Sequence, residues 1–271
     1  MAPATAGQAR IADLVEPLRS DPGAAAVLCD IDGTLAPIVA DPGAVAVPPA
    51  TRDLLAAIAE RYALTACVTG RRAAEARRIV GLKDVTYVGN HGFEILTADA
   101  EDPAPDPALA GRTEIARNFL GTLDANRLAA AGVRSEDKGA IQALHWRGAE
   151  IEEAARMLVK EAASLAQAAG LVPRWGRKVL EIRPVAGIDK GSATLRLVRE
   201  SGVAHALFGG DDLTDLDAFR SLRWLAESGR LQTAACVGVT SEEAPDELAS
   251  RSDVLVDGTE GFVGVLAELA R

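Results

Sequence analysis

Cysteine is scarce in this sequence. The 271-residue chain has only Cys29, Cys67 and Cys236, which form no Cys-x-x-Cys pair and have no histidine beside them. Each lies in a short apolar run, so we predict three buried residues of strands in a reducing compartment, because free cysteine is among the most buried residue types. Cys29 directly precedes an aspartate, but strand alternation points the two side chains to opposite faces. We therefore predict no thiol nucleophile.

Long apolar stretches are absent as well. No window approaches the about 18 uninterrupted apolar residues of a membrane-spanning helix. Residues 1–23 lack the apolar core of a secretory signal. We therefore expect a cytoplasmic protein with no membrane partner.

Basic residues are also in short supply. Lysine and arginine number 29 against 39 aspartates and glutamates, which gives a formal net charge of −10. Nucleic-acid affinity depends on Lys and Arg that neutralise phosphates, so this balance argues against a nucleic-acid partner. It does not exclude a small anionic substrate bound in a local positive pocket.

Short apolar runs alternate with amphipathic helical stretches along most of the chain. This alternation is typical of βαβ units around a parallel sheet that is covered on both faces. We expect six strands, at 25–30, 64–69, 85–89, 204–208, 234–239 and 254–256. Helices are expected at 48–62, 71–81, 190–202 and 214–229, where proline or glycine marks an end. The predicted fold class is α/β, with a doubly wound, Rossmann-like parallel sheet.

The middle of the chain has a different pattern. The stretch "EDPAPDPALAG" begins at Glu101, and two strand-like pieces follow, at 139–147 and 178–184, with a long helix between them at 149–170. Both pieces alternate in a half-exposed manner, which indicates a sheet with one wet face. We therefore predict a smaller α+β domain, residues 106–187, inserted into a core of residues 24–105 and 188–271. Residues 1–23 form a separate N-terminal segment in this prediction.

Two acids follow the first predicted strand. The stretch "CDIDGTL" puts Asp30 and Asp32 on the same side of the chain, at the strand end where open α/β sheets bind ligands. Their repulsion calls for a cation, and Mg²⁺ is the natural one because it prefers carboxylate, phosphate and water oxygens. Gly33 and Thr34 let the backbone turn and offer N–H groups to an anion. From this stretch alone, a turn capped by aspartate remains an alternative.

A second acidic cluster follows another apolar strand. The stretch "LFGGDDLTDLDAF" contains Asp211, Asp212, Asp215 and Asp217. Asp211 comes first after the glycines, so it is best placed to complete a metal site beside Asp30. Asp215 and Asp217 lie at a predicted helix start, where the helix dipole favours carboxylates without any further role.

Two weaker signals lie between these clusters. The stretch "VTGR" ends a strand with Thr69, Gly70 and Arg71, where the hydroxyl can donate to a phosphoryl oxygen and the glycine lets the backbone come close. The stretch "IDKGSA" puts Lys190 just before a helix, where its charge can reach a phosphate or an aspartate. Each of these two signals alone is typical of an ordinary turn. However, the four motifs "CDIDGTL", "VTGR", "IDKGSA" and "LFGGDDLTDLDAF" follow one another in an order that rarely arises by chance.

With these motifs the chain resembles the haloacid dehalogenase (HAD) superfamily of Mg²⁺-dependent phosphotransferases, over about residues 24–100 and 188–271. Within that superfamily it is similar to the trehalose-6-phosphate phosphatases. The narrower resemblance rests on "DIDGTLAPIV", "GNHGFEI", "EDKGAIQALHWR", "GRKVLEIRP" and "GDDLTDLDAF". It therefore extends through the inserted domain, which is the cap of such enzymes. One departure is "HWR", where we would expect His-Tyr-Arg.

The resemblance implies a two-step hydrolysis of trehalose 6-phosphate. Asp30 would attack phosphorus to form an aspartyl-phosphate, and Asp32 would protonate the leaving sugar oxygen and then activate water. Mg²⁺ would be held by Asp30, the backbone carbonyl of Asp32, and Asp211. Thr69 and Lys190 would hold the phosphoryl oxygens. The remaining candidates, for phosphate contact or for support of the catalytic groups, are Gly33, Thr34, Gly70, Arg71, Asp212 and Asp215.

The sugar must be recognised elsewhere, because these groups bind only a phosphate ester. Sugar hydroxyls call for convergent charged and amide side chains. We predict sugar contacts from Asn90, His91 and Glu94 of the "GNHGFE" loop, and from His145, Arg147, Lys178, Glu181 and Arg183 of the inserted domain. The implied partners are a sugar phosphate and, functionally, a trehalose-phosphate synthase.

Two alternatives to this function remain open. A phosphatase for another sugar phosphate, such as glucosylglycerol phosphate or sucrose phosphate, would keep the core motifs and differ in the cap. A non-catalytic sugar-phosphate sensor, or a pseudoenzyme that binds a partner, would be expected to lose a catalytic acid. Both Asp30 and Asp32 are present.

Overall fold

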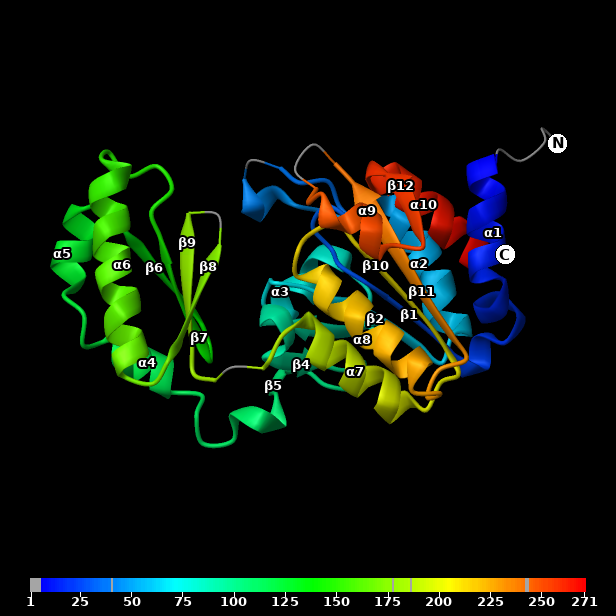
Figure 1. The fold of residues 1–271 in the computed structure, drawn as a ribbon, viewed down its shortest axis with the longest axis horizontal. Helices are drawn as coiled ribbons and strands as arrows, with labels where there is room; N and C mark the ends of the chain where they lie inside the picture. The colour runs from blue at the N-terminus through cyan, green and yellow to red at the C-terminus, as the bar shows by residue number, and fades with distance from the viewer. Residues whose placement is uncertain (1–5, 40, 177, 186, 242–243) are drawn as a thin grey trace. The chain divides into compact units, whose positions relative to one another are not determined.

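The computed structural model describes residues 6–39, 41–176, 178–185, 187–241 and 244–271, so the first five residues of the predicted N-terminal segment lie outside it. The chain divides into two compact units (Figure 1). Unit 1 comprises Met1–Ala104 and Ile188–Arg271, and unit 2 comprises Pro105–Gly187. The chain thus leaves unit 1 once, forms unit 2, and returns to unit 1.

Unit 1 is built on an eight-stranded sheet with the order β12-β11-β10-β1-β2-β3-β4-β5. The strands from β12 to β3 are parallel, and β4 runs antiparallel to β3. Their bounds are β1 (Ala25–Cys29), β2 (Leu64–Val68), β3 (Thr86–Gly89), β4 (Glu94–Leu96), β5 (Ala104–Pro105), β10 (His205–Gly210), β11 (Thr233–Thr240) and β12 (Val254–Asp257). All six predicted strands are confirmed, with ends shifted by a residue or two. The short strands β4 and β5 were not predicted.

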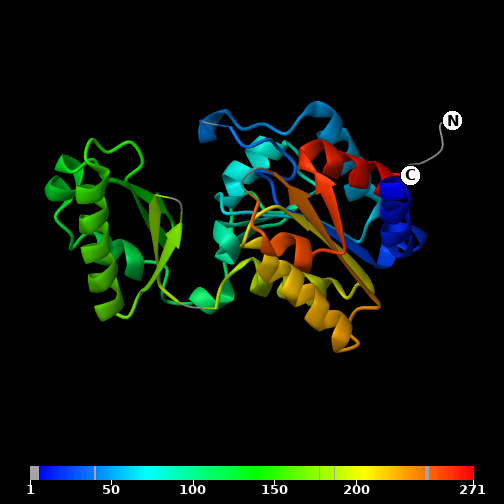
Figure 2. The same cartoon turned by 45° about the horizontal axis from the view of Figure 1, so that its top comes forward.

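Helices cover both faces of this sheet, as Figure 2 shows. One face carries α1 (Ala6–Ser20), α2 (Pro49–Arg61), α3 (Ala73–Val80) and α10 (Gly258–Leu269), and the other carries α7 (Lys190–Ser201), α8 (Asp215–Glu227) and α9 (Glu247–Arg251). Short 3₁₀ turns lie at Pro22–Ala24, Pro42–Ala44, Asn90–Gly92 and Pro107–Leu109. The α/β fold class is therefore confirmed, with a sheet sandwiched between two helical layers.

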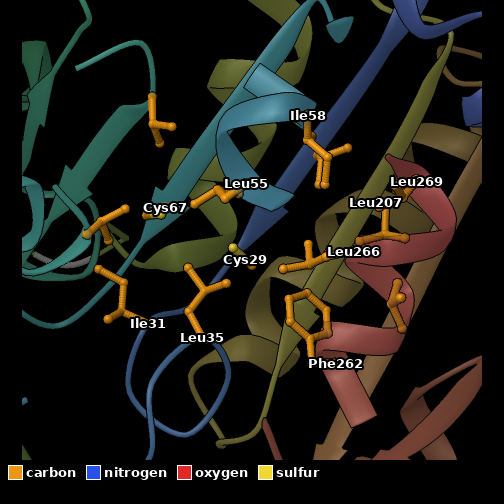
Figure 3. Close-up of a cluster of buried hydrophobic side chains, with 14 of the residues drawn as sticks. Cys29, Ile31, Leu35, Leu55, Ile58, Cys67, Leu207, Phe262, Leu266 and Leu269 are labelled. Carbon is orange, nitrogen blue, oxygen red and sulfur yellow. The ribbon is translucent and has the colours of Figure 1, made fainter. Parts of the chain in front are cut away.

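The core under the first helical layer fixes the strands that carry the site. Figure 3 shows Cys29 of β1 and Cys67 of β2 among Leu55 of α2 and Phe262 of α10. All three cysteines are buried, as predicted. Helix α1 also contributes to this core through Val15 and packs beside α10. Since β1 is held from both faces, the residue that follows it has a fixed position.

Unit 2 is a four-stranded antiparallel sheet with helices on one face. The strand order is β6 (Arg134–Lys138), β7 (Ile141–His145), β9 (Val179–Arg183) and β8 (Val172–Gly176), and the helices are α4 (Ile115–Leu120), α5 (Ala125–Ala130) and α6 (Glu152–Ala168). Leu144 of β7 and Leu180 of β9 pack against Val159 of α6. The α+β character and the long helix are confirmed, and the opposite face of the sheet carries charged side chains.

None of the described helices combines the length and the apolar character needed to cross a bilayer.

Candidate active site

Four neighbouring strands of unit 1 end at the same edge of the sheet. In the order β10, β1, β2 and β3, the residues that follow them are Asp211, Asp30, Thr69 and Asn90. The chain crosses from β1 to β2 on one side, whereas β10 pairs with β1 on the other side, so the direction of winding reverses at β1. Open α/β sheets bind ligands at such a point. The candidate active site therefore lies beyond the carboxyl end of β1.

Three buried acids meet there. Carboxylate oxygens of Asp30, Asp211 and Asp215 lie within 4.8 Å of one another. One oxygen of Asp30, Oδ2, is 3.0 Å from Lys190 Nζ, whereas Oδ1 is buried and accepts no hydrogen bond from any described residue. A buried carboxylate oxygen without a partner is costly, so this site fits a bound cation. An all-oxygen donor set suits a hard divalent ion such as Mg²⁺.

Asp215 has a different task from the other two acids. Its Oδ1 lies 2.8 Å from Lys190 Nζ, and its Oδ2 accepts the backbone N–H groups of Asp211 (2.9 Å) and Asp212 (3.1 Å). Both oxygens are thus engaged, and the side chain is fully buried. Asp215 therefore orients Lys190 and the start of α8, which leaves Asp30 and Asp211 as the better cation ligands.

The turn after β1 holds Asp211 in place. Gly33 has φ +81°, and a Cβ atom there would lie 2.2 Å from Asp211 Oδ2, so only glycine fits. Thr34 Oγ1 donates to Asp211 Oδ1 over 3.2 Å. The backbone N–H groups of Gly33 and Thr34 donate within the turn, to the carbonyls of Ala36 and Ile31. These N–H groups are thus used inside the turn, and the contact of both residues with an anion stays a prediction.

The crowding of acids shifts their pKa values apart. Burial raises the pKa of Asp30 to about 6, against the opposing effect of Lys190. Burial, together with the charge of Asp30, raises the pKa of Asp211 to about 7. Burial acts in the same direction on Asp212, but the charge of Lys190 and hydrogen bonds from Thr214 hold its pKa at about 2. A bound cation would remove the cost of ionising Asp30 and Asp211 together.

The Asp32 carboxylate is bound by Arg71. Arg71 Nη2 donates to Asp32 Oδ1 and Arg71 Nε donates to Asp32 Oδ2, each over 2.7 Å. The third arm, Nη1, donates to Glu75 Oε1 over 2.5 Å. Asp32 is also more exposed than Asp30, with 33% of its side chain accessible against 7%. Arg71 thus holds both oxygens of Asp32, while about a third of the side chain remains open to solvent.

The loop after β3 packs against the end of β2. A Cβ atom on Gly70 would lie 2.7 Å from His91 Nε2, and the N–H of His91 donates to the carbonyl of Thr69. Asn90 and His91 both adopt left-handed backbone angles, with φ of 51° and 57°. Such angles are uncommon for residues other than glycine, although asparagine and histidine adopt them more readily than most, and strained residues cluster at functional sites. The structure thus brings Thr69, Gly70, Asn90 and His91 together.

Glu94 has a structural contact that the sequence did not suggest. Its Oε1 accepts the backbone N–H of Ala73 over 2.6 Å, which satisfies a donor in the first turn of α3. The predicted sugar contact of Glu94 stays a prediction beside this role.

Unit 2 gathers several of the predicted sugar-binding residues on the charged face of its sheet. Glu181 Oε1 is 3.1 Å from Lys138 Nζ, and its Oε2 is 2.6 Å from Arg183 Nη2. His145 Nε2 lies 2.8 Å from Glu136 Oε2 on the neighbouring strand.

Lys178 and Arg147 are the other two predicted residues of unit 2. Lys178 pairs with Glu152 at the start of α6, over 2.7 Å, and Arg147 is exposed. Sequence reasoning missed Glu136 and Lys138 as site candidates. Their strand, "RSEDK", has no apolar residue, and the quoted motif "EDKGAIQALHWR" was the one signal that included them.

Comparisons with known proteins agree with this geometry. A family model described as Trehalose-phosphatase matches residues 28–252. The chain is 36% identical over 213 residues to the trehalose-phosphate phosphatase of Mycolicibacterium paratuberculosis, and 31% identical over 221 residues to the probable trehalose-phosphate phosphatase G of Arabidopsis thaliana. Each alignment covers 73% of this chain, but 51% and 58%, respectively, of the relative. The chain therefore spans just over half the length of these curated relatives.

A solved structure supports the fold over the whole chain. The C-terminal domain of the trehalose-6-phosphate phosphatase from C. albicans superposes with a TM-score of 0.73, over 100% of this chain and 98% of that domain, at 20% identity. At this identity the likeness shows a shared fold with a cap domain.

Proposed function

Because the chain belongs to the trehalose-phosphatase family, we propose that it hydrolyses trehalose 6-phosphate to trehalose and phosphate, with Mg²⁺ as cofactor. The observation that carries the chemistry is the buried Asp30 carboxylate, with Lys190 on one oxygen and no described hydrogen-bond donor on the other. Asp30, Asp211 and the backbone carbonyl of Asp32 would hold the metal. When bound, it would neutralise the charge between the carboxylates and the phosphate dianion.

With the metal bound, residues of unit 1 would supply the groups for two displacement steps. Asp30 attacks phosphorus as the bond from phosphorus to the sugar oxygen breaks, and Asp32 supplies the proton to that oxygen. Water then attacks the aspartyl-phosphate and gives its proton to Asp32, which releases phosphate and restores Asp30. Splitting the transfer in this way makes two easier steps from one difficult step. Lys190 and Thr69 would stabilise the phosphoryl oxygens during both.

Unit 2 would supply the sugar specificity. Its charged sheet face offers Glu181, Lys138, His145 and Glu136 as hydrogen-bonding groups for hydroxyls. Such a set suits a disaccharide, which presents many hydroxyls, better than a small aryl phosphate.

Phosphate release from a panel of sugar phosphates tests this proposal. We expect trehalose 6-phosphate to be hydrolysed at least about 100-fold faster, by kcat/KM, than glucose 6-phosphate or sucrose phosphate, because a site built for hydroxyls rejects analogues that leave its polar groups unpaired. Activity should disappear with EDTA and return with Mg²⁺. Equal rates across the panel would refute the sugar assignment, and activity that survives EDTA would refute the metal requirement.

Metal binding should also depend on pH in the absence of substrate. Folded-state pKa values of about 6 for Asp30 and about 7 for Asp211 exceed the ordinary value of 3.8. A raised pKa contributes stability at low pH that is lost as pH rises through it, so the metal-free protein should lose this contribution between about pH 4 and pH 7. Saturating Mg²⁺ should therefore raise the melting temperature by roughly 5 °C or more at pH 8 and by much less at pH 5.

The matched variants are Asp211→Asn, which should remove most of the Mg²⁺ effect, and Asp217→Asn, which should keep it. Asp217 belongs to the same acidic segment but pairs with Arg220. A shift of the same size at pH 5 and pH 8 would contradict the prediction.

A further inference from the structure

We propose that Arg71 is a positioning residue that aims the Asp32 carboxylate, and that Glu75 anchors Arg71 in this position. The inference rests on the proposed function, in which Asp32 carries a proton in both steps. It starts from the two 2.7 Å hydrogen bonds by which the Arg71 guanidinium holds both oxygens of Asp32.

Asp32 needs such support because of its surroundings. It follows the buried Asp30 by two residues, and Asp30 itself belongs to a cluster with Asp211 and Asp215. The negative charge of Asp30 repels the Asp32 carboxylate, which at 33% exposure could turn towards water if no partner held it. A planar guanidinium that grips both oxygens fixes the plane of the carboxylate as well as its position.

Arg71 is itself held at every end. Nη1 donates to Glu75 Oε1, the backbone N–H donates to Thr69 Oγ1 over 3.3 Å, and the backbone carbonyl accepts the N–H of Asn90 over 2.7 Å. Only 12% of the side chain is exposed. The position of the guanidinium is therefore determined by β2, by the loop after β3 and by α3 together.

The bonds between Arg71 and Asp32 contribute more to the orientation of the Asp32 carboxylate than to the stability of the fold. A partly buried ion pair gains little net free energy, because desolvation of the two charges offsets their attraction. Orientation, in contrast, has a large effect on proton transfer, since a small misplacement of a catalytic group can cost about 100-fold in rate.

The two steps would respond differently to a misaimed Asp32. A sugar alkoxide is a poor leaving group and needs the proton from Asp32, so release of the sugar would slow. p-Nitrophenolate leaves without a proton, so formation of the aspartyl-phosphate from p-nitrophenyl phosphate would not slow. Hydrolysis of the aspartyl-phosphate needs Asp32 as a base for either substrate.

Rapid-mixing kinetics with p-nitrophenyl phosphate separates these steps. For Arg71→Lys we expect a burst of about one p-nitrophenol per enzyme at close to the wild-type rate, followed by steady-state turnover that is roughly 10- to 100-fold slower. Glu75→Gln should show the same burst with a smaller loss of steady-state turnover. This variant tests the proposal if Arg71→Lys does not fold. With trehalose 6-phosphate, kcat should fall by a similar factor, with KM within about two-fold of wild type.

Arg72→Lys is the matched control, because Arg72 is exposed and neighbours Arg71 in the chain. It should behave as wild type in every assay. If Arg71 instead bound the phosphate directly, Arg71→Lys would raise KM for both substrates and weaken inhibition by inorganic phosphate, which would overturn the proposal. So would an Arg71→Lys variant that slows the burst as much as the steady state.

A separate measurement, of intact mass, tests the aspartyl-phosphate mechanism on which the proposal for Arg71 rests. Acid-quenched Arg71→Lys enzyme should carry one added phosphoryl group by intact mass. If neither wild type nor any variant carried a phosphoryl group, the aspartyl-phosphate mechanism would be refuted, whatever the kinetics of Arg71→Lys.

Discussion

Replacing Asp30 with asparagine is expected to lower the turnover of trehalose 6-phosphate by about 10⁴-fold or more. The amide is close to the carboxylate in size, so the end of β1 should keep its position in the packed sheet. It is, however, a very poor nucleophile, and it removes one of the two charges that face Lys190. The loss should therefore fall on chemistry, with the fold preserved.

Single-turnover phosphate release with enzyme in excess measures this loss, and intact mass after acid quench tests its cause. Asp30→Asn should carry no phosphoryl group with any substrate. Asp32→Asn is the informative comparison, because with p-nitrophenyl phosphate it should form the aspartyl-phosphate and fail to hydrolyse it. A rate for Asp30→Asn within about 100-fold of wild type would be incompatible with covalent catalysis by this residue.

The strands of unit 1, and the order of the motifs that follow them along the chain, could be predicted because buried parallel strands leave a strong local signal. Runs such as "AAAVLC" and "ALFGG" are apolar throughout, and the acids come directly after them. Knowing that Asp30 and Asp211 each end a strand is enough to place them at one sheet edge. The pairing of β10 with β1 is not local, and neither segment indicates it on its own.

Contacts between side chains that are far apart in sequence could not be predicted in this way. The bonds from Arg71 to Asp32 span 39 residues, and their geometry depends on how two strand ends and α3 meet. The contact of Glu94 with Ala73 depends on an antiparallel strand of three residues, which is too short for a periodic pattern. The sequence analysis assigned Asp32 to catalysis, Arg71 to phosphate contact or support of the catalytic groups, and Glu94 to the sugar, and it linked none of them to its observed partner.

Unit 2 shows the same limit in its strands. β6 reads "RSEDK" and has no apolar face of its own, so periodicity gives no signal. Its register against β7 pairs Glu136 with Ala143, and β9 pairs Glu181 with that same Ala143. This cross-strand row is what brings the charges of two distant motifs onto one face.

Removing Lys190 should produce the largest loss of stability. Its side chain is 1% exposed, and its ammonium nitrogen lies 3.0 Å from Asp30 Oδ2 and 2.8 Å from Asp215 Oδ1. Burial alone lowers the pKa of Lys190, but the charges of Asp215 and Asp30 raise it well above its ordinary value, so the group is a cation. Lys190→Met keeps most of the side-chain volume but leaves buried carboxylates unpaired, which should cost about 3–5 kcal/mol of unfolding free energy at pH 8.

The pH dependence of this loss identifies its cause. Without the cation, the folded-state pKa values of Asp30 and Asp215 rise further, and stability tied to a raised pKa is present at low pH and lost as pH rises. The deficit of Lys190→Met against wild type, measured by urea unfolding in EDTA, should therefore be clearly smaller at pH 5 than at pH 8. The control is Lys83→Met, which changes an exposed lysine. Its unfolding free energy should stay within about 0.5 kcal/mol of wild type at both pH values.

A second substitution tests whether charge or packing is responsible. Asp215→Asn removes one of the carboxylates that Lys190 neutralises, so the double variant Lys190→Met, Asp215→Asn should be more stable at pH 8 than the sum of the two single losses predicts. If the two losses simply add, and the deficit of Lys190→Met is the same at pH 5 and pH 8, its cause is lost packing. In that case Lys190 would not be the charge that allows Asp30 and Asp215 to lie together beyond the end of β1.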